Sequence, residues 1–224
     1  MSTLKFRDRQ DAGRQLAAAL SEYADQDPII LGLPRGGVPV AYEVAKRLKA
    51  PLDVFLVRKL GVPGQEELAM GAIASGGIRV LNRDVIALAG LTDDIIDAVA
   101  AREERELERR ERLYRGGRLP LPLAGRTVII VDDGLATGAS MRAAARAVRS
   151  QGPARTVVGV PTAPPDTCES LGREVDELVC LLKPYRFRSV GAWYEDFSQT
   201  SDEEVQRLLQ EGSYSLDPGS SPPG

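Results

Sequence analysis

The most constraining feature of this sequence is the segment Thr127–Met141, which reads T-V-I-I-V-D-D-G-L-A-T-G-A-S-M. It opens with an unbroken β-branched run, Val128 to Val131, which is typical of a strand buried on both faces of a parallel sheet. Asp132 and Asp133 end that strand. A short loop with two glycines follows, and strong helix formers from Met141 to Val148 then predict a helix. The segment therefore predicts two acids at a strand's carboxyl end, beside a helix N-terminus.

This strand, loop and helix predict a ligand site. Ligands of open α/β sheets bind at the carboxyl ends of the strands, and the free N–H groups of a helix N-terminus favour phosphate. Thr137 and Ser140 add hydroxyl donors. Hydrogen-bond donors for phosphate beside paired carboxylates suit a ligand that carries both a phosphate and a diol. A divalent cation would then lie between the negative charges of the ligand and the carboxylates. A Walker A loop is excluded, because G-x-x-x-x-G-K-[ST] does not occur in the sequence.

Val128 to Ser140 resembles the phosphoribosyl-pyrophosphate (PRPP) signature of type I phosphoribosyltransferases: a hydrophobic strand, two acids, two small or apolar residues and a T-G-x-S loop. The resemblance implies a doubly wound parallel α/β fold. It implies that Asp132 and Asp133 hold the ribose hydroxyls and, through water, Mg²⁺. It also implies that the 5'-phosphate lies in a cradle formed by Ala136, Thr137, Gly138, Ala139 and Ser140. The implied reaction transfers phosphoribosyl from PRPP to a nitrogen of a nucleobase-like acceptor and releases pyrophosphate.

A second loop follows an earlier predicted strand, Pro28–Leu33, and precedes a helix with an apolar face. Its two glycines let the backbone approach an anion, and Arg35 supplies charge, although an ordinary turn is the alternative. The resemblance implies a pyrophosphate loop here, formed by Pro34, Arg35, Gly36 and Gly37. In such a loop we expect a non-proline cis peptide, at Arg35–Gly36.

The next predicted strand, Asp53–Val57, ends in two cations, Arg58 and Lys59. Arg58 and Lys59 are expected either to contact pyrophosphate as catalytic residues, as Arg35 is, or to be solvated charges at the end of the strand. V-R-K-L-G-V-P-G, which contains them, resembles the start of the mobile catalytic loop of adenine phosphoribosyltransferases. Beyond it, Ala69–Ala74 and Ile78–Leu81 are expected to pair as a hairpin.

A highly charged helix is predicted over Asp93–Arg115, with Thr92 as its cap and Gly116-Gly117 at its end. Three Glu–Arg pairs lie along this helix at i,i+4 spacing, and the apolar stripe of the helix is narrow. Such a run is typical of a solvated face. We interpret residues 83–120 as an insertion that covers the site or contributes to a homodimer.

Aromatic residues gather in the segment 183–200, after two further strands at Thr156–Val160 and Val175–Leu182. Phosphoribosyltransferases carry a small hood over the base, and F-R-S-V-G resembles the F-x-x-V-G of hypoxanthine-type members. The resemblance makes three residues the base-binding candidates: Phe187, Trp193 and Tyr194. A packed aromatic edge of the sheet is the alternative.

Ser201 and Glu204 form a predicted capping box for a last helix through Leu209. Residues 1–210 are then expected to be one phosphoribosyltransferase domain, and 211–224 a disordered tail.

One position departs from the resemblance. Hypoxanthine-type enzymes have an aspartate where this sequence has Ala136, and alanine cannot accept a proton from the base. Either another carboxylate does so, with Glu195 and Glu67 as candidates, or the acceptor needs no base, or the chain is not a purine-salvage enzyme. Gly134 also replaces the usual apolar residue.

Composition excludes several classes. The sequence has no histidine, which excludes Ser-His-Asp triads and His-ligated zinc. A net charge of -3 argues against a general nucleic-acid binder. Cys168 and Cys180 lack metal-like partners and are expected to be free thiols. No stretch is long and apolar enough for a signal core or a membrane span, so a cytoplasmic protein is expected.

Three functions remain open at this point: a magnesium-dependent phosphoribosyltransferase, a regulatory protein that senses PRPP without turnover, and a nucleotide-binding hydrolase. Ala136 fits the regulator, but the acidic chain lacks a basic recognition helix.

Overall fold

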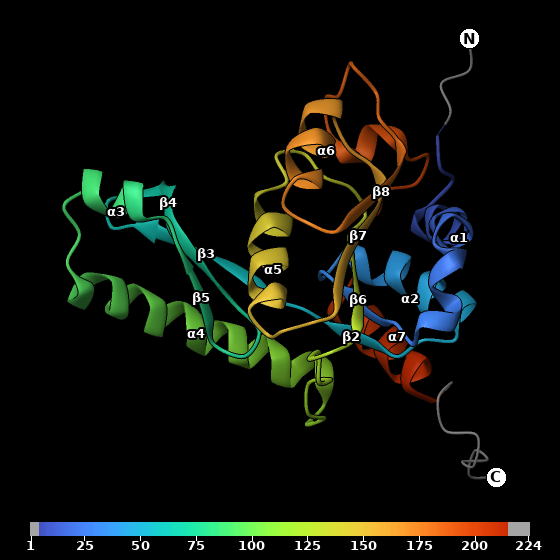
Figure 1. Cartoon of the computed structure of the whole chain (residues 1–224), viewed down its shortest axis with the longest axis horizontal. Helices are drawn as coiled ribbons and strands as arrows, with labels where there is room; N and C mark the ends of the chain where they lie inside the picture. Colours follow the sequence, from blue (N-terminus) through green and yellow to red (C-terminus); the bar gives the residue numbers. More distant parts are fainter. Residues whose placement is uncertain (1–4, 215–224) are drawn as a thin grey trace.

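The computed structural model describes residues 5–214, which form a five-stranded parallel sheet with helices on both faces (Figure 1). The strands lie in the order β2-β1-β6-β7-β8, so the central strand is the one that precedes the paired acids. Their bounds are β1 Ile29–Gly32, β2 Leu52–Val54, β6 Thr127–Val131, β7 Arg155–Thr162 and β8 Glu177–Leu182. The predicted doubly wound parallel sheet is confirmed.

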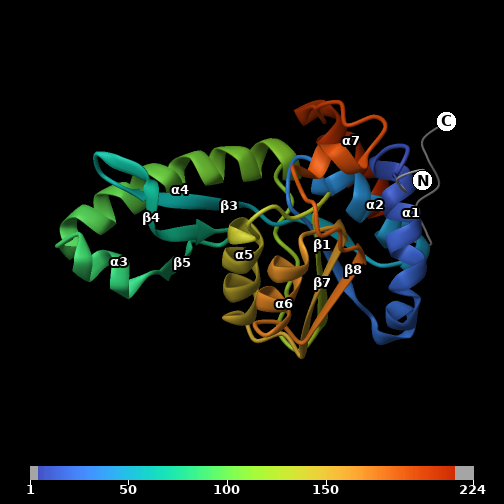
Figure 2. The same cartoon turned by 90° about the horizontal axis from the view of Figure 1, so that it is seen from above.

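Two layers of helices cover this sheet (Figure 2). One face carries α1 (Arg9–Ala19), α2 (Gly37–Leu48) and α7 (Asp202–Tyr214), and the other carries α5 (Ala139–Arg149) and α6 (Pro165–Gly172). Alternate side chains of β6 point to opposite faces. Ile129 and Val131 accordingly join the core under α1 and α2, while Val128 and Ile130 join the core under α5 and α6. Short 3-10 turns cover Ser21–Gln26 and Val190–Trp193.

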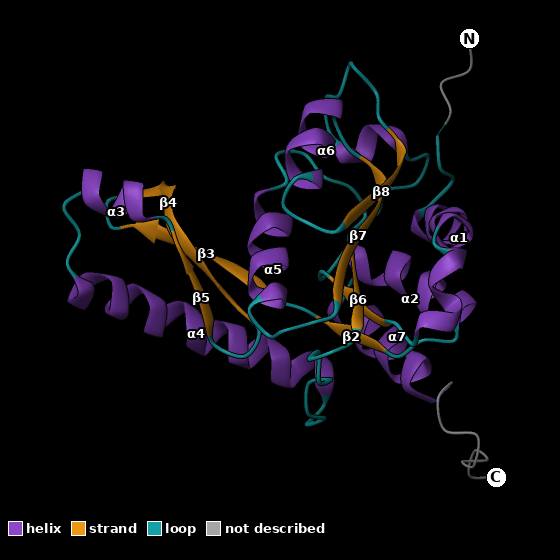
Figure 3. Cartoon of the chain, in the orientation of Figure 1, coloured by secondary structure: helices purple, strands orange, loops and turns teal. Residues whose placement is uncertain are grey.

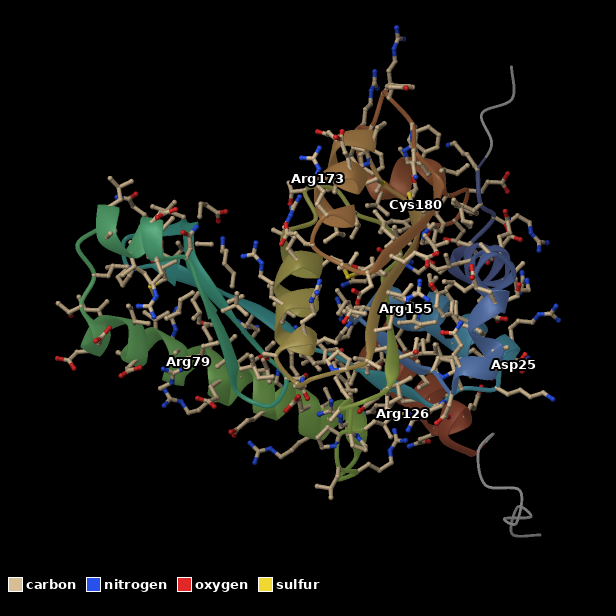
Figure 4. The ribbon with its side chains drawn as sticks, viewed as in Figure 1. Asp25, Arg79, Arg126, Arg155, Arg173 and Cys180 are labelled. Carbon is tan, nitrogen blue, oxygen red and sulfur yellow. The ribbon has the colours of Figure 1, made fainter. Side chains whose placement is uncertain are left out.

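A second, antiparallel sheet stands apart from the first, with strand order β3-β4-β5 (Figure 3). Its elements are β3 (Val57–Val62), β4 (Gln65–Ala74), β5 (Ile78–Leu81), α3 (Arg83–Leu88) and α4 (Asp93–Arg115). We call this unit, residues 57–115, the arm. It projects from the five-stranded sheet, and α4 runs along it (Figure 1). Arg79 of β5 makes an ion pair with Asp97 of α4, 2.5 Å away, where the two meet (Figure 4).

The arm changes one expectation and confirms another. The predicted β4–β5 hairpin is confirmed. The predicted strand Asp53–Val57 is wrong in its bounds, because β2 ends at Val54 and a new sheet begins at Val57. Two hydrogen bonds to Ser75, each 2.9 Å long, hold Leu56 outside the first sheet. The Leu56 N–H donates to the Ser75 hydroxyl, and the Ser75 N–H donates to the Leu56 carbonyl. Arg58 and Lys59 therefore lie inside β3 rather than at the end of β2.

α4 matches the predicted bounds and is fixed to the main sheet by a buried ion pair. The Nε of Arg115 lies 3.0 Å from Asp53 Oδ1, and its Nη2 donates to the Val54 carbonyl at 2.9 Å. All three i,i+4 pairs of the prediction form: Glu106 with Arg110, Glu108 with Arg112 and Glu111 with Arg115. Thr92 occupies the N-cap position, but its side chain makes no capping hydrogen bond.

The last helix, α7, begins after Ser201, whose Oγ accepts from the Glu204 N–H at 3.1 Å. It continues to Tyr214, beyond the predicted end at Leu209 and into the segment expected to be a tail. Residues 1–4 and 215–224 lie outside the described part of the chain. Within residues 5–214, no helix combines the length and apolar character needed to cross a membrane.

Candidate functional site

The two predicted ligand loops meet at the carboxyl ends of β1 and β6. A Cβ on Gly36 would lie 2.0 Å from Asp133 Oδ2, and one on Gly37 would lie 2.9 Å from the Asp132 Cα. Both distances are too short for any larger residue, so glycine is required where the loop passes the acids. The cis peptide expected at Arg35–Gly36 lies one residue earlier, between Pro34 and Arg35.

A small cavity opens at this meeting point. We call it the acid cavity. Its volume is about 140 Å³, and it is lined by Leu33, Pro34, Phe55, Leu56, Val57, Arg58, Arg110, Asp132 and Ser140. The fold thus brings together one predicted acid, one predicted cation, the pyrophosphate-loop proline and the last residue of the predicted phosphate loop. These groups lie far apart in the sequence.

Asp133 is held differently from Asp132. Arg9 of α1 donates from Nε to Asp133 Oδ2 at 2.8 Å, and its guanidinium lies 3.9 Å from the centroid of the Phe197 ring. The Tyr194 hydroxyl donates to the Asp133 carbonyl at 2.6 Å. Asp133 is therefore fixed from two directions, while Asp132 faces the acid cavity.

The electrostatics of the two acids follow from this placement. Burial and the neighbouring Asp133 carboxylate raise the pKa of Asp132. Burial also raises the pKa of Asp133, but the hydrogen bond and charge of Arg9 oppose that shift. Asp132 has no ion pair within residues 5–214. A half-buried carboxylate that makes no ion pair of its own can bind a cation brought in with a ligand.

The phosphate loop lies at the start of α5, where the N-cap residue Gly138 has no side chain and only the Ala139 N–H donates to a side chain, Thr137 Oγ1, at 3.4 Å. Gly138 adopts φ 73°, the left-handed conformation that turns the chain into the helix. The loop is held from one side, because Thr167 donates from Oγ1 to the Ala136 carbonyl at 2.9 Å and Arg142 donates to the Thr137 carbonyl at 2.7 Å. The uncapped N–H groups leave a helix N-terminus able to bind an anion.

Two aromatic side chains of the predicted hood, Tyr185 and Phe187, line a cavity beside this loop. We call it the hood cavity. Its volume is about 540 Å³, and it is lined by Ala136, Thr137, Arg142, Pro164, Asp166, Thr167, Ser170, Tyr185 and Phe187. Phe187 is half-buried there.

Tyr194 and Trp193 are placed elsewhere. The prediction that Tyr194 binds the base is not supported by its position, because its ring is 3 % exposed and packs between Phe6 and Phe197. Trp193 is half-buried against the same cluster, away from the hood cavity, and its buried Nε1 has no partner within the described residues.

The predicted cations separate as well. Arg58 lines the acid cavity and donates from Nε to Glu103 Oε2 at 2.7 Å. Lys59 faces away from the acid cavity, toward a larger cavity between the arm and α5, and pairs with Glu67 at 3.3 Å. Its prediction as a pyrophosphate contact is not supported by this position, because successive strand residues point to opposite faces.

Arg35 is anchored beside the pyrophosphate loop. Its Nη1 lies 3.8 Å from Asp202 Oδ1 of α7, and Tyr114 of α4 donates to the same oxygen at 2.6 Å. Burial and the bond to Asp202 raise the pKa of Tyr114 to about 12, so its phenol stays protonated. α4 and α7 thus meet beside the loop.

Three site residues escape the sequence reasoning: Arg9, Arg110 and Asp166. Arg110 belongs to a charge run that is typical of a solvated face, and only its contact with the acid cavity distinguishes it. Asp166 could have been found, because it follows the end of β7 and opens α6, which is the pattern that identified Asp132. Both cysteines are free, as predicted, with Cys168 buried and Cys180 half-buried.

Comparison with known proteins identifies the family. The sequence model of the phosphoribosyl transferase domain matches residues 5–167. The chain belongs to this family. Rv0571c of Mycobacterium tuberculosis strain H37Rv, whose name places it with the phosphoribosyl transferases, is 51% identical over 204 residues. The match covers 91% of this chain and 46% of that protein, so the chain spans about half the length of this curated relative.

A solved structure shares the fold of this chain. The protein TT1426 from Thermus thermophilus is 46% identical, with a TM-score of 0.84, and the match covers 93% of this chain and 99% of that one. The bifunctional protein PyrR of Chloroflexus aurantiacus is 32% identical over 129 residues, which are 56% of this chain and 65% of that protein. The predicted family resemblance and fold class are confirmed.

Proposed function

We propose that this phosphoribosyltransferase-family chain transfers the 5-phosphoribosyl group of PRPP to a nucleobase-like nitrogen and releases pyrophosphate. The observation that carries the proposal is the acid cavity, where Asp132, Arg58 and Ser140 meet beside the Pro34–Gly37 loop. A ligand there would contact a carboxylate, a guanidinium and the N-terminus of α5 together. PRPP carries the diol, the pyrophosphate and the 5'-phosphate that such a set of groups recognises.

In the proposed reaction, a ring nitrogen of the acceptor bonds to the anomeric carbon of PRPP. The bond from that carbon to pyrophosphate breaks, and pyrophosphate leaves with the electron pair. Arg58 and Arg35 would stabilise the charge that grows on the leaving group, an effect that often dominates catalysis. Asp132 would bind the ribose hydroxyls. Asp133, fixed by Arg9 and Tyr194, would complete the diol site.

Magnesium fits this site. Asp132 is a half-buried carboxylate whose pKa is raised, and a cation shared with PRPP would stabilise its charged form. No group of three acidic or thiol side chains able to hold a metal occurs within residues 5–214, so the ion would be held by Asp132, water and PRPP oxygens. Bound Mg²⁺ would neutralise charge on the leaving pyrophosphate.

The hood cavity is the proposed place of the acceptor. Phe187 offers an aromatic face, and Asp166 is the carboxylate beside Ala136. We assign to Asp166 the proton acceptance that Ala136 cannot perform. Glu195 and Glu67, the candidates from sequence, do not line the hood cavity, and the Glu67 side chain is fully exposed.

Pyrophosphate release from PRPP and Mg²⁺, measured across purine and pyrimidine bases, tests the proposal. We expect release in step with consumption of one class of base. PRPP binding by calorimetry without release on any base would instead support the PRPP-sensing protein, the second candidate, which Ala136 favours. Phosphate or pyrophosphate release from nucleotides without a base would contradict both and support a hydrolase.

A further inference from the structure

The largest of the cavities described here lies between the arm and α5 and shares only Ala139 and Ser140 with the predicted phosphate cradle. We call it the arm cavity. Its volume is about 580 Å³, and it is lined by Val57, Lys59, Ala69, Gly71, Ala72, Val80, Leu81, Asn82, Arg83, Ala139, Ser140, Arg142, Ala143 and Arg146. This volume falls within the ~300–1,000 Å³ typical of small-molecule sites.

The lining combines an apolar floor with a cationic rim. Val57, Val80 and Leu81 of the second sheet form the floor, together with small side chains of β4 and α5. The rim carries four cations: Lys59, Arg83, Arg142 and Arg146. No acidic side chain lines the cavity, although the chain has 32 acidic residues against 29 basic ones. Cations therefore gather here against the balance of the whole chain.

The charge of this rim is only partly neutralised. Lys59 pairs with Glu67 at 3.3 Å, and Arg142 and Arg146 share Glu174 at 3.1 and 2.8 Å. Arg83 has no ion pair within residues 5–214. Two carboxylates thus face four cations, and the remaining positive charge attracts an anionic group.

We propose that the arm cavity binds a small molecule with an apolar body and an anionic group, separately from PRPP. The apolar body would lie on the floor, and its anion would contact Arg83 and Arg146. Val57 and Ser140 line both the arm cavity and the acid cavity, so a ligand here would lie next to the proposed transfer site.

Fluorescence titration with anilinonaphthalene sulfonate, an anionic aromatic probe, tests this site on the full chain. We expect saturable binding at one site per chain. The neutral analogue N-phenyl-1-naphthylamine should bind at least about tenfold more weakly, since it lacks the anion that the cationic rim would bind. Equal affinity for the two probes would overturn the role of the cationic rim.

Two variants locate the probe. Arg83→Glu reverses an exposed charge at the start of α3, where an acid is compatible with the helix dipole, and is expected to weaken the anionic probe about tenfold or more. Ala143→Trp fills the cavity from α5 and is expected to block both probes. Arg105→Glu is the matched control, because it makes the same charge change on an exposed part of α4 outside the cavity.

Unchanged probe affinity in Arg83→Glu would overturn the proposal, as would equal weakening by Arg105→Glu. Absence of probe binding to the wild-type chain would overturn it as well, including the case in which a second copy covers the cavity. None of these outcomes depends on transfer activity, so the site and the proposed function fail independently.

Discussion

At the residue scale, the two acids at the end of the central strand, Asp132 and Asp133, differ in their surroundings. Asp132 is half-buried beside the acid cavity and makes no ion pair among the described residues, whereas Asp133 is paired with Arg9 at 2.8 Å. The folded pKa of Asp132 lies above its ordinary value of 3.8, so its charged form costs stability as the pH rises above that value. Below that pH the Asp132 carboxyl is protonated in both the folded and the unfolded state, so it does not lower the stability of the fold. The Asp132 carboxylate is thus a local source of instability in the ligand-free protein.

We predict that Asp132→Asn raises the Tm of the ligand-free protein at pH 8 by roughly 2–4 °C, the change that about 1 kcal/mol produces in a chain of this size. The gain is expected to disappear near pH 3.5, where wild-type Asp132 is protonated. Asp133→Asn is the matched control and is expected to lower the Tm, because it leaves Arg9 without its partner. Thermal melts across pH decide, and a pH-independent shift would contradict the assigned burial.

Asp166 carries a second prediction. If it accepts the acceptor's proton, Asp166→Asn lowers kcat about 10²- to 10⁴-fold, the usual contribution of general acid–base catalysis. The PRPP affinity is expected to stay unchanged, because Asp166 lines the hood cavity and not the acid cavity. Glu195→Gln serves as control and is expected to retain full activity. Steady-state kinetics measure both, and equal loss in the two variants would remove the assignment.

Phe187 can be tested in the same assay. Phe187→Ala would remove aromatic–base stacking worth about 1–3 kcal/mol and weaken the acceptor roughly tenfold or more. PRPP affinity would change little, because Phe187 contacts neither Asp132 nor the Pro34–Gly37 loop. Calorimetry with each ligand separates the two effects. Parallel loss of both affinities would mean that Phe187 is a packing residue.

At the scale of elements, the attachment of α4 depends on a buried charge pair. Arg115 and Asp53 are 7% and 5% exposed, so water has little access to either partner. We predict that Arg115→Ala lowers the free energy of unfolding by about 3–5 kcal/mol, because it leaves Asp53 buried and unpaired. Arg112→Ala, on the exposed face of the same helix, is expected to cost under ~1 kcal/mol. Urea unfolding measures both, and similar values would contradict the role of burial.

The elements also show how far the sequence could be interpreted. The central strand, both ligand loops and α4 were predictable, because each has a strong local pattern: a β-branched run, paired glycines or a capped charge run. The break between β2 and β3 was not, since it depends on hydrogen bonds between Leu56 and the distant Ser75. The same holds for the site. The places of Asp132 and Arg58 at the site were predictable. The cavity toward which Lys59 points and the burial of Tyr194 were not, because both follow from tertiary packing.

For the whole molecule, the arm and the main sheet share one core. Leu60, Met70 and Leu107 of the arm belong to the same buried cluster as Ile129 and Val131 of β6. We therefore predict a single calorimetric unfolding transition, with equal van't Hoff and calorimetric enthalpies. A separate transition at lower temperature, shifted further down by Arg115→Ala, would show instead that the arm unfolds by itself.

The bond from Arg115 to the Val54 carbonyl, at 2.9 Å, joins the two ends of the arm. The chain thus departs from the main sheet and returns to it at nearly one point. A segment with this geometry can gain or lose residues at its far tip without changing the span that the chain must bridge. The turn around Gly64, which joins β3 to β4 at the end of the hairpin away from the main sheet, is consequently the place where residues can be inserted or deleted, or a tag can be added, with the sheet order intact.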